Sequence, residues 1–475
     1  MGVGGMGHPG RGRALVAHGR GVGRFQVAGS VGLETAAPRL RYLDMLRVVA
    51  IGAVVIGHWL LVDITYQSGH LSGLDALDYV SWGGWVTLLF QVMPVFFLVG
   101  GYVNAQSWAS HRRRGVTWAA WVQGRSLRLL WPTTVYVAVA SLAVVAATVA
   151  GANTSELAEA GWLVALHLWF LPVYLLLIAL TPAMLAAHRR WGLAVPAVMA
   201  VCAAGVDIAV VGSHVPVIGF ANYLLVWGSM HQWGFAWQDR SLTRPRWRPY
   251  ALAAAGATTL TALVVWGPFP VDMIGAGGHT GNTSPPSIAL LAFAATQAGL
   301  ALVFEPAGTK LLEQPRRWRV VQRLNPAVMT VYLWHMVPVI VVAIAIYPRF
   351  AVPQPSVGSW QWWALRPAWI AVLAAILIPL SVAIMRLERP LARLPYGGAS
   401  GGAWSAVLVA AGIGAAGVGL ARLAISGFAV QGRLSMPALA AYCCGLVLVV
   451  LPGRRTGPAV SGPTSRRLPP RAAGL

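Results

Sequence analysis

Arg47 and His58 lie eleven residues apart in the first long apolar segment of the chain, RYLDMLRVVAIGAVVIGHWLLVDI. An α-helix turns about 100° per residue, so this spacing brings both side chains to one face, about 16 Å apart along the axis. In a helix that spans a membrane, Arg47 would lie at the boundary and His58 near the middle of the bilayer. Imidazole titrates near neutral pH, so we interpret His58 as a candidate general base. A hydrogen-bonded packing histidine is the alternative.

Two carboxylates lie close to this pair in the sequence. Asp44 precedes Arg47 by three residues, so the two are neighbours on one helix face and can form an ion pair. Anchoring the helix at the membrane surface is the alternative role of that pair. Asp63 follows His58 by five residues, which places it about 140° away around a continuous helix. We therefore expect Asp63 to form no catalytic dyad with His58.

Three more polar residues are expected inside apolar segments. His167 lies in HLWFLP near the outer side of its segment, and His335 lies in NPAVMTVYLWHM at about mid-depth. Each histidine alone is more often structural than catalytic, but together with His58 they indicate a polar interior between three helices. Asp207, in GVDIAV, is expected to balance one of the arginines or histidines.

Arg125 and Arg128 are i,i+3 neighbours in GRSLRLLWP, at the predicted cytoplasmic start of an apolar helix. Guanidinium groups bind phosphate oxygens in a bidentate manner, so this pair is a candidate phosphate clamp. Ordinary positive charge in a cytoplasmic loop is the alternative. In the preceding segment VMPVFFLVGGYV, we expect Pro94, Gly100 and Gly101 to bend the helix or to admit a close neighbour.

The composition is that of a multi-pass helical membrane protein. Of 475 residues, 57% are hydrophobic and 10% are charged, whereas soluble domains carry about 25% charged residues. The formal net charge is +22, but the arginines fall in short blocks between apolar runs, which indicates loop topology and no nucleic-acid binding. Cys202, Cys443 and Cys444 lie in apolar runs, so the sequence predicts no disulfide framework and no metal site.

Apolar runs of membrane-spanning length recur along the chain. We predict an all-α polytopic integral membrane protein with about twelve transmembrane helices. They lie near 46–65, 84–104, 128–150, 162–186, 192–211, 216–236, 250–268, 287–306, 326–346, 363–385, 403–423 and 435–452. Arginine blocks occupy alternate loops, so the positive-inside rule places both termini in the cytoplasm. Lys310 is the only lysine, and this arginine-rich composition is typical of a bacterium with a GC-rich genome.

The two ends of the chain and two long outward loops are the remaining parts of the predicted organisation. Residues 1–38, rich in Gly and Arg, and residues 456–475 are expected to be disordered cytoplasmic tails. The outward loops 66–83 and 267–287 are long, polar and rich in Gly. They are interpreted either as a lid or binding surface or as plain solvated loops.

The motifs, taken in order, resemble those of membrane acyltransferase family 3, a group of bacterial O-acyltransferases that act on sugars and other envelope molecules. The matching pieces are R-x10-H, FFLVGGY, R-x-x-R-x-x-x-P, HLWFL and YLWH. They begin at Arg47, Phe96, Arg125, His167 and Tyr332. The resemblance covers residues 39–390, and the ordered set is more specific than any single motif.

The resemblance implies a core of ten helices, an acyl-coenzyme A donor that enters from the cytoplasm, and an acceptor that is often presented at the outer face. By the same resemblance, His58 would be the catalytic histidine, with Arg47 beside it. Arg125 and Arg128 would bind the donor or shape its site. The residues implied as possible site lining are Asp44, His167, Trp169, Tyr332 and His335.

Some features depart from the family pattern. Residues 391–455 add two apolar segments beyond the expected ten, and the N-terminus is long and basic. Val99-Gly100 stands where the family often has Ser-Gly. These differences leave the acceptor and the direction of transfer open.

Together these features predict an integral membrane O-acyltransferase of the bacterial plasma membrane. It would move an acetyl or other short acyl group from acyl-coenzyme A to a hydroxyl of a cell-envelope glycan, glycolipid or related acceptor. The competing class is a multi-pass transporter or flippase for a lipid-linked or small-molecule substrate, although Asp207 is the only clear acid at mid-span. A membrane scaffold or polymer-export partner with a degenerate acyltransferase fold is the third interpretation.

Overall fold

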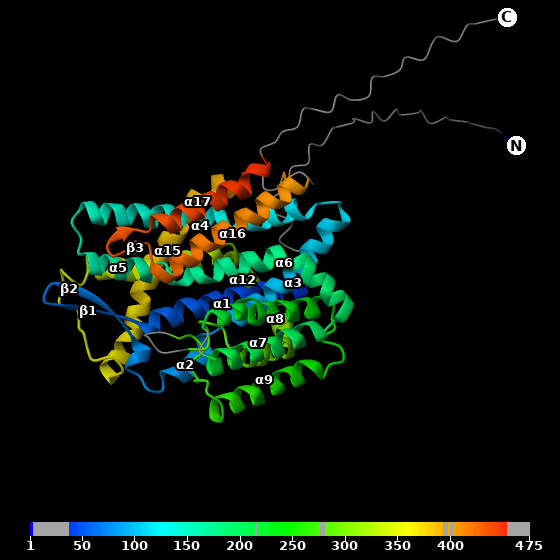
Figure 1. Ribbon diagram of the computed structural model, residues 1–475, viewed down its shortest axis with the longest axis horizontal. Helices are drawn as coiled ribbons and strands as arrows, with labels where there is room; N and C mark the ends of the chain where they lie inside the picture. Colours follow the sequence, from blue (N-terminus) through cyan, green and yellow to red (C-terminus); the bar gives the residue numbers. More distant parts are fainter. Residues whose placement is uncertain (3–37, 214–215, 276–280, 393–397, 400–401, 454–475) are drawn as a thin grey trace, which may run out of the picture.

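The computed structural model describes residues 1–2, 38–213, 216–275, 281–392, 398–399 and 402–453. The two predicted tails, 1–38 and 456–475, therefore lie almost entirely outside the described residues. The described chain is mostly helical, and many of its helices run along the long axis of the molecule (Figure 1). In this view α16 and α17 lie on one side of α1, and α7 and α9 lie on the other.

Among the helices, the longest have the length needed to cross a bilayer. Their bounds are α1 (Pro38–Leu61), α2 (Gly83–Phe90), α3 (Met93–Arg113), α4 (Trp118–Val149), α5 (Thr154–Leu163), α6 (Phe170–Trp191), α7 (Ala194–Ser213), α8 (Ala221–Gln238), α9 (Arg248–Val265), α10 (Ile288–Val303), α11 (Glu305–Leu311), α12 (Pro315–Leu324), α13 (Val328–Trp334), α14 (Val337–Ala345), α15 (Trp360–Ala392), α16 (Ala403–Ser426) and α17 (Met436–Val450). Two antiparallel hairpins join them: β1 (Val62–Gln67) with β2 (His70–Asp75), and β3 (Ala429–Val430) with β4 (Arg433–Leu434).

Fewer candidate membrane spans are found among the described residues than the sequence suggested. Among the described residues, seven helices are long and apolar enough to cross a membrane, or up to nine if each of two bent helix pairs is one span. The expectation of about twelve spans is therefore not confirmed. Two of the predicted spans, α17 and α8, have visible reasons for not being among these candidates. Helix α17 has only 15 residues, and α8 carries several buried polar side chains, Asn222, Ser229, His231 and Gln232.

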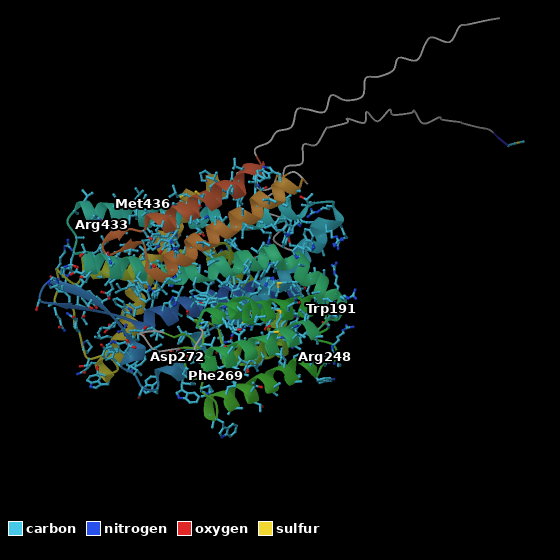
Figure 2. All side chains as sticks on the ribbon, viewed as in Figure 1. Trp191, Arg248, Phe269, Asp272, Arg433 and Met436 are labelled. Atoms are coloured by element: carbon cyan, nitrogen blue, oxygen red, sulfur yellow. The ribbon has the colours of Figure 1, made fainter. Side chains whose placement is uncertain are left out.

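The loops lie at two opposite ends of the bundle. Figure 2 shows Trp191 and Arg248 at one end and Arg433 toward the other. Trp191 ends α6 and Arg248 begins α9, and both belong to loops expected on the cytoplasmic side. Arg433 belongs to a loop expected on the outer side. The arrangement agrees with the predicted alternation of loops, and the orientation in a membrane stays a prediction.

Helices α3 and α8 approach until their backbones touch. A Cβ atom on Gly101 would lie 2.1 Å from the carbonyl oxygen of His231, and one on Gly234 would lie 2.2 Å from that of Leu98. Only glycine permits so short a separation, because any side chain would overlap the neighbouring backbone. The expectation that the glycine pair of this segment admits a close neighbour is confirmed at Gly101.

The first outward loop folds into the β1–β2 hairpin. Ser68 and Gly69 form its turn with positive φ values of 52° and 86°, as expected for a two-residue turn between antiparallel strands. The backbone amide of Gly73 donates to a carboxylate oxygen of Glu159 (2.6 Å), and that of Leu71 donates to Glu156 (3.3 Å). Both glutamates lie in α5, so this loop is a structured cap rather than a plain solvated loop.

The second outward loop is also tied to the bundle. The amide of Met273 donates to the hydroxyl of Thr87 (2.9 Å), and the side-chain amide of Gln91 donates to the carbonyl of Met273 (2.8 Å). Asn282 donates to the carbonyl of Asp272 (2.8 Å). Residues 276–280 of this loop lie outside the described residues. The described parts of the loop thus close over the break between α2 and α3.

The C-terminal helices α16 and α17 pack into the core. The hydroxyls of Tyr442 and Thr134 are 2.8 Å apart, and the side-chain amide of Gln123 donates to the carbonyl of Val449 (2.7 Å). Thr134 and Gln123 belong to α4. In the loop between the two helices, the ring of Phe428 lies 6.2 Å from that of Tyr136, centroid to centroid. The two additional segments are therefore part of the bundle.

Candidate active site

His58 and His335 are joined by a hydrogen bond across the bundle. Nδ1 of His58 and Nε2 of His335 are 2.7 Å apart. We expected His58 near the middle of a membrane helix, but α1 ends three residues after it. The chain leaves the helix there because three of the four residues in VDIT, residues 62–65, are β-branched and favour the extended conformation of β1. The histidine pair therefore lies where helices end.

His335 stands at a break in an expected span. The helix Pro315–Trp334 and α14 are bent by 53° relative to each other. Pro338, in the first turn of α14, has no N–H to donate, and its ring is incompatible with a helical carbonyl at Trp334. The amide of Val339 donates to the carbonyl of Met336 (3.2 Å). The carbonyl of His335 is thus left for another donor.

Two tryptophans secure this break. The indole N–H of Trp59 donates to the carbonyl of His335 (2.7 Å). The indole N–H of Trp369, in α15, donates in turn to the carbonyl of Trp59 (2.9 Å). Because Trp59 directly follows His58, one short stretch of α1 both carries an imidazole and holds the backbone of its partner. The relative position of the two histidines is fixed by side-chain and backbone contacts together.

His167 and Tyr332 complete the polar cluster. His167 lies in a short 3-10 turn, Leu166–Trp169, that leads into α6, and it is buried. Its ring centroid is 5.0 Å from that of His335. The hydroxyl of Tyr332 donates to the carbonyl of His167. The structure thus brings three of the predicted lining residues to His58.

Trp169, also predicted to line the site, packs elsewhere. Its ring centroid is 5.3 Å from that of Trp227 in α8 and 6.5 Å from that of Phe170. Trp227 is fully buried. The described ring contacts place Trp169 on the aromatic core between α6 and α8 rather than on the histidines.

The Arg47 end of the same helix face is more open. A guanidinium nitrogen of Arg47 lies 4.0 Å from a carboxylate oxygen of Asp44, and their side chains are 36% and 31% exposed. The side-chain amide of Asn325 donates to Asp44 (3.1 Å). The predicted ion pair is present, at the limit of the distance for such a contact. Exposed pairs of this kind contribute at most about 1 kcal/mol.

Arg125 is held by the bundle interior rather than left free at the surface. Its guanidinium donates to the side-chain carbonyl of Asn104 in α3. The amide nitrogen of Asn104 is 3.4 Å from Nε2 of His231 in α8. The positive charges of Arg128 and Arg47 lie near enough to repel that of Arg125, and Arg128 is exposed. The three predicted arginines therefore form one group, called the arginine cluster below.

Asn104 and His231 were missed by the sequence analysis. Both are fully buried polar residues inside helices, which is a signal for a functional or structural hydrogen bond. Nothing in their sequence neighbourhood shows that they meet. Their contact follows from the close approach of α3 and α8 at Gly101 and Gly234, which is a tertiary feature.

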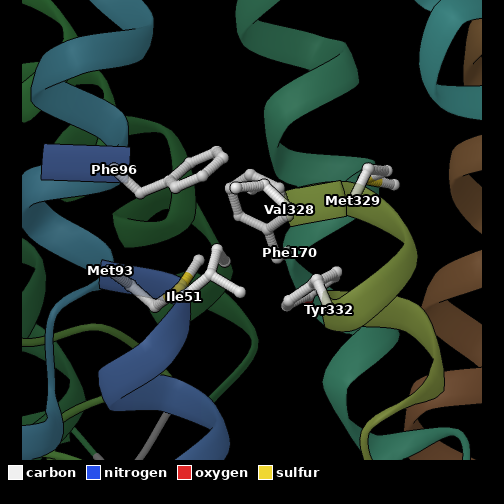
Figure 3. Close-up of a pocket in the computed structure, with 7 residues that line it drawn as sticks. All are labelled: Ile51, Met93, Phe96, Phe170, Val328, Met329 and Tyr332. Atoms are coloured by element: carbon white, nitrogen blue, oxygen red, sulfur yellow. The ribbon is translucent and has the colours of Figure 1, made fainter. Parts of the chain in front are cut away.

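An apolar hollow lies beside α1 at Ile51, between the positions of Arg47 and His58 along the helix. It is small, with a cavity volume of about 10 Å³, and takes its walls from α1, α3, α6 and α13 (Figure 3). Ile51 lies four residues after Arg47 and seven before His58, so it shares their helix face. Tyr332 lies one helical turn before His335. The lining residues are Ile51, Met93, Phe96, Phe170, Val328, Met329 and Tyr332.

Comparison with known families decides the class of the protein. The family model described as an acyltransferase domain, acyltransferase family 3, matches residues 40–386, which is more than half of the chain. This chain belongs to that family. The resemblance inferred from the motifs is thereby confirmed. No statistically significant match to a curated protein or to a solved structure was found.

In this acyltransferase, Asp63 has a partner other than His58. A carboxylate oxygen of Asp63 accepts a hydrogen bond from the guanidinium of Arg366 (2.6 Å). The same guanidinium lies 3.6 Å from the ring centroid of Trp362. Burial and the nearby Asp63 carboxylate raise the pKa of Tyr347 to about 12. The expectation that Asp63 is not part of a dyad with His58 agrees with this pairing, whereas Arg366 was not singled out from the sequence.

Asp207 of the acyltransferase caps a helix. One carboxylate oxygen accepts from the side-chain amide of Asn222 (2.7 Å), and the other accepts from the backbone amide of Ile288 (2.6 Å). Ile288 is the first residue of α10, where backbone amides lack helical partners and the helix dipole favours negative charge. The expectation that Asp207 balances an arginine or histidine is wrong, because these amide donors occupy its carboxylate.

Proposed function

We propose that this acyltransferase moves an acetyl or other short acyl group from acyl-coenzyme A to a hydroxyl of a cell-envelope glycan, glycolipid or related acceptor. One observation carries the proposal. On one face of α1, Arg47, the hollow lined by Ile51, and His58 with its hydrogen-bonded partner His335 follow one another. Such a transfer needs a site for an anionic donor and a group that accepts a proton, and the molecule offers a candidate for each.

The arginine cluster suits the nucleotide end of the donor. Coenzyme A carries phosphate groups, and guanidinium binds phosphate oxygens with good geometry. The contact between Arg125 and Asn104 holds one guanidinium in place before the donor binds. Arg47 and Arg128 are more exposed, so they can adjust to the donor. The hollow beside Ile51 supports a position for the less polar thioester arm.

His58 is proposed as the general base. Its imidazole takes the proton of the acceptor hydroxyl while the hydroxyl oxygen attacks the thioester carbonyl. A C–O bond forms, the C–S bond breaks, and the leaving thiolate of coenzyme A takes the proton from the imidazolium. The products are the acylated acceptor and free coenzyme A. A transient acyl group on the histidine is the alternative route.

The acceptor is proposed to arrive from the outer face of a bacterial plasma membrane. His58 lies in the last turn of α1, next to the β1–β2 hairpin. The arginine blocks support an orientation with that end of α1 outside and both termini in the cytoplasm. The nucleotide end of the donor would then bind on the cytoplasmic side, and the thioester arm, with the acyl group still bound to its sulfur, would extend along the face of α1 that carries Arg47, Ile51 and His58.

Labelled acyl transfer tests the proposal. Membranes that contain the full-length protein are supplied with acetyl-coenzyme A labelled in the acetyl group, and the label is followed into envelope glycans and lipids by mass spectrometry. We expect His58→Gln to lower the rate about 10²–10⁴-fold. His70→Gln, in the exposed hairpin, is the matched control and should retain the rate. Equal labelling by His58→Gln and the unaltered protein would contradict the proposal.

Transport is the second candidate function. Two helix pairs are bent at a break, α10 with α11 by 51° and Pro315–Trp334 with α14 by 53°, and discontinuous spans are common in secondary transporters. Against it, the carboxylate of Asp207 is occupied as a helix cap. Substrate movement into sealed vesicles without consumption of acyl-coenzyme A would favour transport.

A further inference from the structure

We propose that His335 is a positioning residue that fixes the tautomer of His58 and so leaves Nε2 of His58 as the nitrogen that accepts a proton. The assignment of the tautomer rests only on the hydrogen bonds of the two rings. Its consequence for catalysis rests on the proposed function. The sequence placed His335 among the residues that line the site and gave it no role of its own.

The hydrogen bonds determine where the protons lie. Nδ1 of His335 is 2.7 Å from the carbonyl oxygen of Tyr332. A carbonyl oxygen only accepts, so this nitrogen carries a proton. In a neutral imidazole the other nitrogen, Nε2, is then bare. It faces Nδ1 of His58 at 2.7 Å, so Nδ1 of His58 must donate, and Nε2 of His58 is left bare in turn.

The surroundings of His335 favour its neutral form. The side chain is fully buried, and its ring neighbours include His167 at 5.0 Å and Tyr332 at 6.3 Å between centroids. A buried charge is costly unless an opposite charge compensates it. Aromatic and imidazole rings provide no such compensation, so the singly protonated ring described above is the stable state.

The two rings meet edge to edge. Their planes differ by only 11°, and their centroids are 5.0 Å apart while the two nitrogens are 2.7 Å apart. The nitrogens therefore lie between the ring centres, nearly in both ring planes, and the contact is a hydrogen bond rather than a face-to-face stack. This is the direction in which an imidazole N–H points and in which the lone pair of the other ring lies.

The position of His335 is set by its backbone. Pro338 breaks the helix there, and Trp59 binds the carbonyl of His335 (2.7 Å). Nδ1 of the ring is bound to the carbonyl one helical turn earlier, that of Tyr332. A ring held at both its backbone and its Nδ1 has little freedom to turn. It can therefore orient the ring of His58.

The hydrogen bond between His58 and His335 remains in place when His58 accepts a proton. When Nε2 of His58 accepts a proton, Nδ1 of His58 still donates to Nε2 of His335. The bond becomes charge-assisted and therefore stronger. His335 thus stabilises the imidazolium that forms on His58 without itself touching the acceptor or the donor.

Nitrogen NMR tests the tautomer directly. The full-length protein, labelled with ¹⁵N in histidine, is measured near neutral pH in detergent micelles, and His58→Gln and His335→Gln assign the two signals. We expect His58 to be protonated at Nδ1 and bare at Nε2. A proton on Nε2 of His58 in the unaltered protein would overturn the proposal. Because this measurement needs no substrate, its result stands whether or not the protein transfers acyl groups.

Kinetics with two variants of similar size test the consequence. In His335→Gln, the side-chain oxygen can accept from Nδ1 of His58, whereas His335→Leu offers no acceptor. We expect His335→Leu to lower kcat about 10- to 100-fold, as for the loss of a buried hydrogen-bond partner, with little change in the KM for acetyl-coenzyme A. His335→Gln should regain most of that loss. Equal kcat in both variants would contradict a positioning role, even if His58→Gln is inactive.

Discussion

The two ends of the face shared by Arg47 and His58 are built in different ways. At the histidine end, hydrogen bonds of 2.7 Å join His58, His335 and Trp59, and the partner side chains are buried. At the arginine end, Arg47 is 36% exposed, and its contact with Asp44 is 4.0 Å long. Hydrogen-bonded neighbours fix the imidazole of His58, whereas the more exposed guanidinium of Arg47 can change its conformation.

The difference between the two ends matches two parts of the proposed reaction, which are proton transfer at His58 and binding of the donor at the arginine cluster. Proton transfer requires atoms at set positions, because a small displacement of a base lowers the rate steeply. Binding of a flexible anion requires charge and several donors, and tolerates side chains that move. On this comparison, substitutions at the histidine end should change kcat, and substitutions at the arginine end should change the KM for the donor.

The largest effect is expected at His58. His58→Gln keeps a polar side chain of similar length but cannot serve as a base near neutral pH, so kcat should fall about 10²–10⁴-fold. The KM for acetyl-coenzyme A should change little, because the arginine cluster is untouched. Steady-state kinetics in purified membranes checks both values. If His58→Gln changed only the KM, the proposed division of roles between the histidine end and the arginine end would be wrong.

Arg125 should show the opposite pattern. Arg125→Gln removes a guanidinium that Asn104 holds in place, and a hydrogen bond to a charged group contributes about 1.5–3 kcal/mol. We expect the KM for acetyl-coenzyme A to rise about 10- to 100-fold. Asn104→Ala keeps the charge and releases its anchor, so the increase should be smaller. Donor affinity can be measured by calorimetry, and an unaltered affinity would indicate that Arg125 only sets topology.

Arg128 is expected to matter less than Arg125. It is exposed, and exposed charge contacts contribute about 0.2–1 kcal/mol. Arg128→Gln should therefore raise the KM for the donor by no more than about fivefold. The increase should shrink at high salt, where exposed charges are screened. A salt-independent effect as large as that of Arg125→Gln would show that the two arginines are equivalent.

The smallest effect is expected at Asp44. Asp44→Asn retains a side-chain oxygen that can accept from Asn325, and it loses only a long, exposed ion pair with Arg47. Both kcat and KM should change less than about twofold. A large fall in kcat would mean that the Asp44 carboxylate takes part in the chemistry, and kinetic assays beside those for Arg128→Gln would reveal it.

The sequence indicated the helical class and the common face of Arg47 and His58, because both follow from hydropathy and from the period of a single helix. The grouping of Arg125 with Arg47 also followed from the motifs. The first two features depend on residues that are close in the chain or on a repeated local pattern, whereas the grouping of the arginines came from the resemblance to the family.

The gathering of His58, His167 and His335 was predicted, but the contacts that join these distant segments were not. The hydrogen bond between His58 and His335 joins residues 277 positions apart, and no local pattern reveals it. The break at His335 had a visible signal in Pro338, and the β1–β2 hairpin had one in the three β-branched residues Val62, Ile64 and Thr65. Both signals were outweighed by the apolar composition of their segments, since hydropathy measures solvent preference and not backbone conformation.

Helices α16 and α17 lie beyond the residues matched by the family model, yet they support the far side of the histidines. Phe428 packs on Tyr136, whose ring is 5.6 Å from that of His167 and 5.2 Å from that of Trp334. A chain shortened to residues 40–386 would expose this aromatic wall to detergent or lipid. A truncated protein for purification should therefore not end at the family boundary and should extend at least through Val450.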